Sequence, residues 1–161
     1  MSRLRFGVVG CGAIVTLHQL PALRRCAALD VVAVTDRDAT WATSVAGRFG
    51  VPTAFDDHRR LEGAVDAALI ATPNSTHAAI ACDLLERGIH VLCEKPLTVT
   101  STEAQDLVKL AEEKESLLMM ASKFRYVTDV VQAKSIVSSG LIGDIVLFEN
   151  AFTSRVDMTH R

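Results

Sequence analysis

A short apolar run followed at once by a glycine turn constrains this chain more than any other stretch. Phe6, Val8 and Val9 lie in a run of the kind typical of a strand buried on both faces, and Gly10 and Gly12 interrupt it. Apolar residues then return at helical spacing, so we expect strand, turn and helix in direct succession. Gly10 permits a turn that a side chain would obstruct, and Gly12 lets backbone come close to a bound group.

The helix expected after this turn opens with N–H groups that have no partner inside it. These donors and the helix dipole favour a phosphate, and the dipole alone contributes about 0.3–1 kcal/mol. We therefore expect Gly10, Gly12, Ala13 and Ile14 to bind the diphosphate of a dinucleotide cofactor. Val15 stands where the pattern G-x-G-x-x-G/A has a small residue, and should hold helix and strand slightly apart. For this stretch alone, a turn that binds nothing is the alternative.

Length, composition and charge bound the class of protein. The 161 residues amount to about one domain, and 49% hydrophobic with 22% charged residues is ordinary for a soluble chain. The net charge of −2 predicts neither a nucleic-acid nor a membrane partner. No run approaches the roughly 18 apolar residues of a transmembrane helix, and no apolar signal segment precedes the first strand. The four cysteines lack zinc-site spacing. We expect reduced thiols, no metal and a cytoplasmic location.

Further apolar runs alternate with helical patterns along the chain. Strands are predicted at Asp30–Thr35, Thr53–Phe55, Ala67–Ala71, His90–Cys93 and Leu117–Ala121, with helices at about 38–49 and 75–87. Thr100 and Glu103 have the spacing of a capping box before another helix. Alternation at this spacing implies right-handed crossovers and a parallel sheet covered on both faces. The predicted fold class is therefore α/β, a doubly wound parallel sheet, over residues 1–122.

The chain changes character after Ala121. A helix is predicted from about Val127 to Ser138, and a strand-like run, Ile145 to Phe152, follows it. A six-stranded nucleotide fold needs neither, so residues 123–161 are interpreted as the first helix and strand of an incomplete second domain. A strand without sheet partners recruits another strand. We expect a homo-oligomer through this C-terminal segment, with disorder of the segment as the alternative.

Ligands of a doubly wound sheet bind outside the carboxyl ends of its strands, and Asp36 directly follows the second strand. A carboxylate there can accept hydrogen bonds from both hydroxyls of an adenosine ribose, each worth about 1.5–3 kcal/mol. It would repel a 2′-phosphate, which favours NAD over NADP. The adjacent Arg37 can bind that phosphate, so NADP stays open. A helix N-cap is the alternative role for Asp36.

Two further groups of polar residues follow the fourth and fifth strands. After the fourth come Thr72, Pro73 and Asn74, with His77 three residues on. Pro73 lacks an N–H and stiffens the exit, and Asn74 offers an amide where the nicotinamide half of a dinucleotide would lie. We include these four residues among the candidate cofactor contacts. Considered alone, Asn74 is a turn or cap residue, and His77 is a surface histidine on the first helical turn.

Glu94 and Lys95 follow the fifth strand, and Lys95 is our candidate for chemistry. A lysine beside a nicotinamide can stabilise an alkoxide as hydride leaves its carbon, and partial burial would lower its pKa toward a useful range. A solvated lysine is the ordinary alternative. The bond between Lys95 and Pro96 is a candidate for the cis form.

Together these motifs resemble the Gfo/Idh/MocA family of oxidoreductases. The matching stretches, in chain order, are VVGCGAIV, VTDRD, ATPNSTHA, CEKPLTVT and GLIGDI. The resemblance implies an N-terminal Rossmann domain. It implies cofactor binding by Gly10, Gly12 and Asp36, positions by the nicotinamide ribose for Asn74 and Glu94, and contact with substrate and cofactor for Lys95.

The resemblance also implies a sugar or polyol dehydrogenase that moves a hydride between a hydroxyl carbon and nicotinamide. Family members are much longer, and their second domain supplies an Asp/His pair as proton acceptor. We therefore expect this chain to bind NAD and to turn over little or nothing. A non-catalytic NAD sensor or regulatory module is the alternative. An S-adenosylmethionine methyltransferase is a third class, but it gives no reason for Pro73-Asn74 or Lys95-Pro96.

Overall fold

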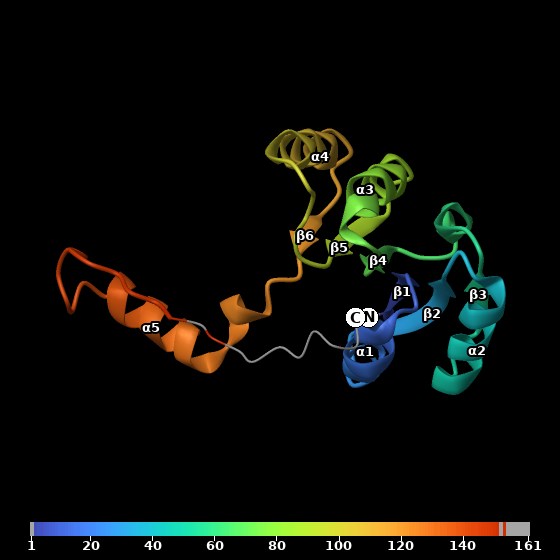
Figure 1. Ribbon diagram of the computed structural model, residues 1–161, viewed down its shortest axis with the longest axis horizontal. Helices are drawn as coiled ribbons and strands as arrows, with labels where there is room; N and C mark the ends of the chain where they lie inside the picture. The colour runs from blue at the N-terminus through green and yellow to red at the C-terminus, as the bar shows by residue number, and fades with distance from the viewer. Residues whose placement is uncertain (1, 152, 154–161) are drawn as a thin grey trace. The chain divides into compact units, whose positions relative to one another are not determined.

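A computed structural model describes residues 2–151 and 153 and divides the chain into two units, Met1–Ser122 and Lys123–Arg161. The first unit is a sheet with helices on both faces (Figure 1). Its strands are β1 Leu4–Val9, β2 Leu29–Thr35, β3 Thr53–Phe55, β4 Ala67–Ile70, β5 His90–Cys93 and β6 Leu118–Met120. Its helices are α1 Leu20–Leu23, α2 Ala39–Phe49, α3 His77–Glu86 and α4 Ser101–Glu113, with shorter turns η1 Val15–Gln19, η2 His58–Leu61 and η3 Asn74–Thr76.

The order of the strands fixes where a ligand can bind. It is β3-β2-β1-β4-β5-β6, and every neighbouring pair is parallel. The chain moves outward from β1 to β3 and then crosses back to place β4 on the other side of β1. The doubly wound parallel sheet is therefore confirmed. Its order reverses between β1 and β4, and the crevice outside the carboxyl ends of these two strands is the expected ligand position.

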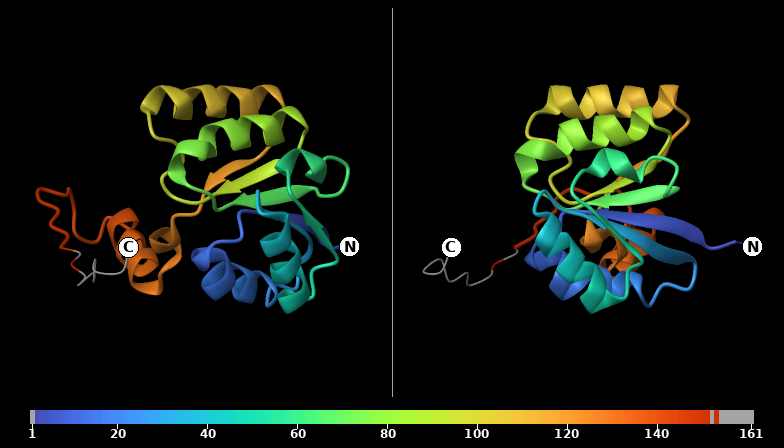
Figure 2. Two further views of the ribbon diagram at one scale, coloured as in Figure 1. Left: turned by 45° about the vertical axis from the view of Figure 1, so that its right-hand side comes forward. Right: turned by 90° about the vertical axis from the view of Figure 1, so that its right-hand side faces the viewer.

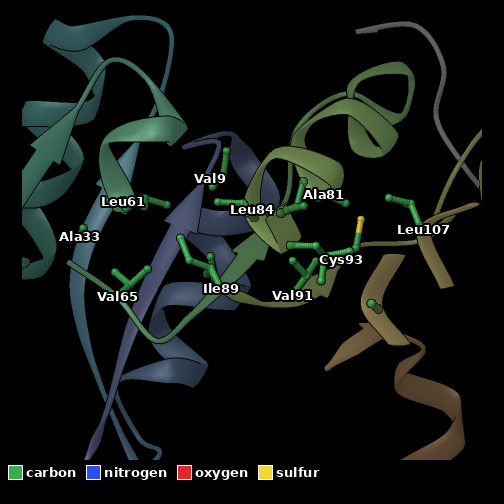
Figure 3. Packing of buried hydrophobic residues seen from close by; sticks show 14 residues of the cluster. Val9, Ala33, Leu61, Val65, Ala81, Leu84, Ile89, Val91, Cys93 and Leu107 are labelled. Carbon is green, nitrogen blue, oxygen red and sulfur yellow. The ribbon is translucent and has the colours of Figure 1, made fainter. Parts of the chain in front are cut away.

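The sheet separates two apolar clusters, because successive strand residues point to opposite faces. On one face, Leu84 of α3 and Leu107 of α4 belong to the same cluster as Val9 and Val91 (Figure 3). On the other face, Val8 packs with the residues of the α1 and α2 side, and Figure 2 shows α1 and α2 across the sheet from α3 and α4. Burial on both faces explains why the strands read as continuous apolar runs.

Two predicted helix boundaries are confirmed, the end of a helix at about residue 49 and the capping box at Thr100. Gly50 ends α2 with φ +65°, in the left-handed region that glycine adopts without strain. At the start of α4, the Thr100 N–H donates to the Glu103 carboxylate at 3.0 Å and the Glu103 N–H donates to Thr100 Oγ1 at 3.2 Å. This is the reciprocal capping box that the spacing predicts.

The helix after the glycine turn differs from the expected α-helix. Helical backbone begins at Ala13, but Val15–Gln19 is a π-helix in which the Leu20 N–H donates to the Val15 carbonyl five residues back. Val15 is fully buried in the cluster that contains β1. The wider π turn thus begins at the residue that replaces the small one of the glycine pattern. The helix after β4 also differs, since the turn Asn74–Thr76 precedes it and α3 begins at His77.

The second unit contains the turn η4 Lys123–Tyr126 and the helix α5 Thr128–Ser138. The strand expected over 145–152 is wrong for its described part, because residues 145–151 form no strand, and Phe152 lies outside the described residues. A strand needs a neighbour for its N–H and C=O groups, and none pairs with this segment within the described residues. Separately, the part of the chain that the structure describes has no helix of the length and apolarity that a membrane span requires.

Candidate functional site

A cavity of about 720 Å³ lies at the carboxyl ends of β1, β2 and β4, where the strand order reverses. Six of the residues predicted from the sequence contribute to its wall: Gly10, Gly12, Asp36, Arg37, Thr72 and Pro73. The loop after β3 supplies Asp56, Asp57, His58 and Arg59, which the sequence analysis did not identify. The cavity volume is of the size that small-molecule and cofactor sites occupy.

The backbone conformation and the close neighbours of Gly10 leave no room for a side chain at this position. Its φ is +92°, and a Cβ added there would lie 2.6 Å from the Ala71 carbonyl oxygen at the end of β4. Its N–H donates to the Thr35 carbonyl at 2.8 Å, so Gly10 joins the ends of the three central strands. Gly12 is different, since an added Cβ would meet nothing within 4 Å. The open space at Gly12 is what a bound group needs if it is to approach backbone closely.

Asp36 is not the N-cap of α2. Asp38 has that role, because its carboxylate accepts the Trp41 N–H at 3.0 Å. The Asp36 carboxylate instead accepts the Cys11 N–H at 2.9 Å and the Asp38 N–H at 3.1 Å. Two carboxylate oxygens offer about four acceptor positions, so Asp36 retains acceptor capacity toward the cavity that it lines. It also fixes the glycine turn, a role that no local pattern in the sequence indicates.

Cys11 is fully buried between the two glycines of the turn. Burial, with a smaller contribution from the Asp36 charge, raises the pKa of its thiol to about 12. The thiol lies 3.6 Å from the Thr35 carbonyl, to which it donates. The residue is therefore a neutral part of the core at neutral pH.

Among the described residues, no cluster of three or more His, Cys, Asp or Glu could hold a metal.

One ion pair and one histidine–carboxylate contact hold the wall contributed by the segment after β3. Arg59 donates from Nε and Nη2 to the Asp57 carboxylate, at 3.0 and 2.7 Å, and lowers the pKa of Asp57 to about 2. His58 Nε2 lies 2.8 Å from the Asp83 carboxylate of α3. The local sequence signal for this turn is Asp57, a residue type typical of an N-cap, whose carboxylate accepts the Arg59 N–H at the start of η2. This signal indicates a local turn but not its return to the strand ends.

His77 contradicts the expectation of a surface histidine. It is fully buried, with Nδ1 2.8 Å from the Pro96 carbonyl and Nε2 3.0 Å from the Thr72 carbonyl. Both ring nitrogens therefore face backbone of the segments that follow β4 and β5. Burial leaves the imidazole no free face for a cofactor, and we do not carry His77 forward as a direct contact.

Asn74, Glu94 and Lys95 lie at the ends of β4 and β5 but do not line the cavity. Asn74 is exposed, and its side chain caps no helix. Glu94 accepts a hydrogen bond from Gln19 Nε2 of η1, which ties the helix after the glycine turn to the end of β5. Lys95 is exposed rather than partly buried, and within the described residues it forms no ion pair. The peptide bond between Lys95 and Pro96 is cis.

These residues fit a dinucleotide. Helical backbone begins at Ala13, directly after Gly10 and Gly12, and the N–H groups that open a helix have no partner inside it, as a diphosphate requires. Ala13 and Ile14, the first helical residues, are exposed beside the turn. Asp36 supplies a carboxylate at the end of β2, directly beside the turn.

Known proteins are similar to this chain in sequence and fold. Residues 4–122 match the family model of the Gfo/Idh/MocA oxidoreductases, described as an oxidoreductase family with an NAD-binding Rossmann fold. A dTDP-3,4-didehydro-2,6-dideoxy-alpha-D-glucose 3-reductase from Saccharopolyspora spinosa is 35% identical over 150 residues, which cover 92% of this chain and 45% of that protein.

Solved structures agree. KijD10, a 3-ketoreductase from Actinomadura kijaniata in complex with TDP-benzene and NADP, matches with a TM-score of 0.80 at 33% identity, over 89% of this chain and 46% of that one. An oxidoreductase from Agrobacterium radiobacter in complex with NAD+, L-tartaric acid and magnesium matches with a TM-score of 0.81 at 26% identity, over 89% and 42%. The chain spans less than half the length of these relatives.

The matched residues cover the whole sheet and the glycine turn. The chain belongs to the Gfo/Idh/MocA family of oxidoreductases and carries its NAD-binding Rossmann domain at residues 4–122.

Proposed function

We propose that this chain is the cofactor-binding part of an enzyme that moves a hydride between a sugar or polyol hydroxyl carbon and a nicotinamide dinucleotide. The observation that carries the proposal is the cavity at the strand-order reversal, with Gly10, Gly12 and Asp36 in its wall. The sugar class is supported by the name of the Saccharopolyspora relative, a reductase of a dTDP-linked sugar. Specificity depends on the site rather than on the fold, so the particular substrate is left open.

We propose NAD as the preferred dinucleotide. The Asp36 carboxylate would accept hydrogen bonds from the adenosine ribose and repel a 2′-phosphate. Arg37 also lines the cavity and, within the described residues, has no ion-pair partner, so it is the residue through which NADP would bind. Isothermal titration calorimetry of the chain with each dinucleotide tests this. Tighter binding of NAD is expected, and equal dissociation constants would contradict the preference.

Asp36→Ala distinguishes the contribution of Asp36 to the preference for NAD over NADP from the contribution of Arg37. It should weaken NAD more than NADP, because the lost hydrogen bonds serve the ribose and the lost charge had repelled the 2′-phosphate. Arg37→Ala is the matched control, since it removes an adjacent charge of opposite sign and should weaken NADP alone. An Asp36→Ala chain that loses the same factor for both ligands would assign Asp36 to the shape of the turn.

Lys95 is the proposed catalytic residue. When bound, nicotinamide exchanges a hydride with the substrate carbon. The Lys95 ammonium would donate a hydrogen bond to the substrate oxygen and stabilise negative charge there. Its exposure beyond β5 and its freedom from ion pairs in the described residues leave Nζ available for this contact.

Protection from acylation tests the position of Lys95 without requiring turnover. A lysine-acylating reagent, read out by peptide mass spectrometry, should modify Lys95 more slowly when NAD is present. Lys109, in the middle of α4 rather than at the carboxyl end of a strand, is an exposed control, and its modification should not change. Equal modification of Lys95 with and without NAD would remove it from the cofactor site.

Residues 123–161 are proposed to begin the domain that completes the substrate site and forms a homo-oligomer. Val146, Leu147 and Phe148 are 96, 75 and 78% exposed in a segment without a strand partner in the described residues. Burying them against a second copy would remove apolar area from water. Light scattering over a range of concentrations should show association, and a strict monomer would contradict it.

We propose that the chain by itself binds NAD without steady-state turnover, because alcohol oxidation also needs a base for the hydroxyl proton. Measurable oxidation of inositol or glucose by this chain alone would overturn the proposal. A cytoplasmic location is proposed from its four free thiols.

A further inference from the structure

Two consecutive peptide groups of the glycine turn are held from outside the turn. The Cys11 N–H donates to the Asp36 carboxylate at 2.9 Å, which fixes the peptide between Gly10 and Cys11. The Cys11 carbonyl accepts the indole Nε1–H of Trp41 at 2.8 Å, which fixes the peptide between Cys11 and Gly12. Both polar backbone atoms of Cys11 are therefore occupied by the protein, and neither is offered to a ligand.

Trp41 is well anchored for this contact. It lies in the first turn of α2, where its own N–H donates to the Asp38 cap at 3.0 Å. The Asp38 N–H in turn donates to Asp36 at 3.1 Å. Asp36, Asp38, Trp41 and Cys11 thus form a closed ring of hydrogen bonds between the start of α2 and the glycine turn. Trp41 is the single tryptophan of the chain, and its side chain is about half exposed.

The geometry of a peptide group gives this contact a consequence for ligand binding. The carbonyl of Cys11 and the N–H of Gly12 belong to one planar trans peptide, so they point in opposite directions. A hydrogen bond that holds the carbonyl toward α2 therefore holds the Gly12 N–H away from α2. Gly12 has no Cβ, and an added one would meet nothing within 4 Å. Nothing at Gly12 itself opposes a flip of this peptide, which would present a carbonyl oxygen where an N–H had been.

We propose that Trp41 is a positioning residue for the phosphate-binding turn, whose indole N–H holds the Cys11–Gly12 peptide with its N–H toward the cofactor diphosphate. The inference rests on the proposed dinucleotide binding and extends it to a residue outside the cavity wall. Asp36 holds the preceding peptide in the same way, so the two contacts act on adjacent links of one turn.

Trp41→Phe tests this by removing the N–H while keeping an aromatic ring. Calorimetry compares NAD, ADP and adenosine as ligands. The variant should bind NAD and ADP about three- to tenfold more weakly, the range of one net hydrogen bond. Adenosine has no diphosphate, and its dissociation constant should not change. Thr100→Ala, which loses the cap of α4 far from the turn, is the control for a general loss of stability.

A structural role alone would weaken all three ligands equally in Trp41→Phe, and that result, or unchanged binding of NAD and ADP, overturns the inference. If the wild-type chain binds neither NAD nor ADP, the proposed function fails together with it. If Trp41→Phe does not fold, an NMR titration of the wild-type chain still tests the inference. Its single indole N–H resonance should shift on addition of ADP and not of adenosine, and an unmoved resonance overturns the inference.

Discussion

Gly10→Ala is the substitution for which the structure gives the sharpest magnitude. Gly10 has φ +92°, and a left-handed backbone conformation of this kind destabilises an alanine by about 1–2 kcal/mol. Its Cβ would also lie 2.6 Å from the Ala71 carbonyl oxygen, a backbone atom that can move only with β4. Overpacking of this kind adds about 1–3 kcal/mol. We therefore expect a loss of about 2–5 kcal/mol in the free energy of unfolding.

Gly50→Ala is the matched control, because it separates the two contributions. Gly50 has φ +65°, and an added Cβ there would meet nothing within 4 Å, so only the backbone cost of about 1–2 kcal/mol remains. Urea unfolding followed by far-UV circular dichroism measures both variants, with the slope checked for constancy. Equal midpoints for Gly10→Ala and Gly50→Ala would refute the argument that β4 closes around the turn.

Gly12→Ala completes the series and addresses binding. Its Cβ has open space, so the variant should unfold near the wild-type midpoint while NAD binds more weakly, since the added methyl group occupies space meant for the cofactor. Gly47→Ala, in the middle of α2 and also with open space, should leave NAD binding unchanged and stabilise the helix by up to about 1 kcal/mol. Unchanged NAD affinity in Gly12→Ala would contradict the prediction that the cofactor lies against the turn.

Three further predictions concern stability and reactivity. Arg59 lowers the pKa of Asp57 from 3.8 to about 2, so the charged Asp57 stabilises the fold above pH 4 and this contribution is lost as pH falls toward 2. Between pH 4 and pH 2 the free energy of unfolding should therefore fall less for Asp57→Asn than for the wild-type chain. Thr100→Ala removes the capping box with Glu103 and should cost about 1 kcal/mol, measured by urea unfolding. A thiol reagent at pH 8 should modify the exposed Cys26 first, and the two buried cysteines, whose pKa burial raises to about 12, only on unfolding. Rapid reaction of a buried thiol would contradict the packing of the turn.

The sequence by itself determined the alternation of strands and helices. Apolar runs broken by glycine or proline, and the capping box at Thr100, are local signals, and local hydrogen bonds decide them. The doubly wound class follows, because crossovers between parallel strands have one hand. The same signals gave the glycine turn and Asp36, since a ligand of this sheet meets the residues that directly follow its strands.

Tertiary structure decided what each candidate residue contacts. The pattern around His77 predicted an exposed first turn, yet the segments after β4 and β5 close over the ring and bring a backbone carbonyl within hydrogen-bond distance of each of its nitrogens. The wall from Asp57 to Arg59 follows a three-residue strand and returns to the cavity only because β3 pairs beside β2. The strand expected over 145–152 did not form in its described part, because pairing needs a neighbour.

Trp41 illustrates the difference most plainly. In the sequence it is an aromatic residue near the start of a helix, with no pattern to connect it to Cys11 thirty positions earlier. Spacing along one chain reports which residues share a face of one element, but not which elements meet. The sheet order brings α2 beside the glycine turn, and a single indole hydrogen bond then sets the direction of the peptide that precedes Gly12.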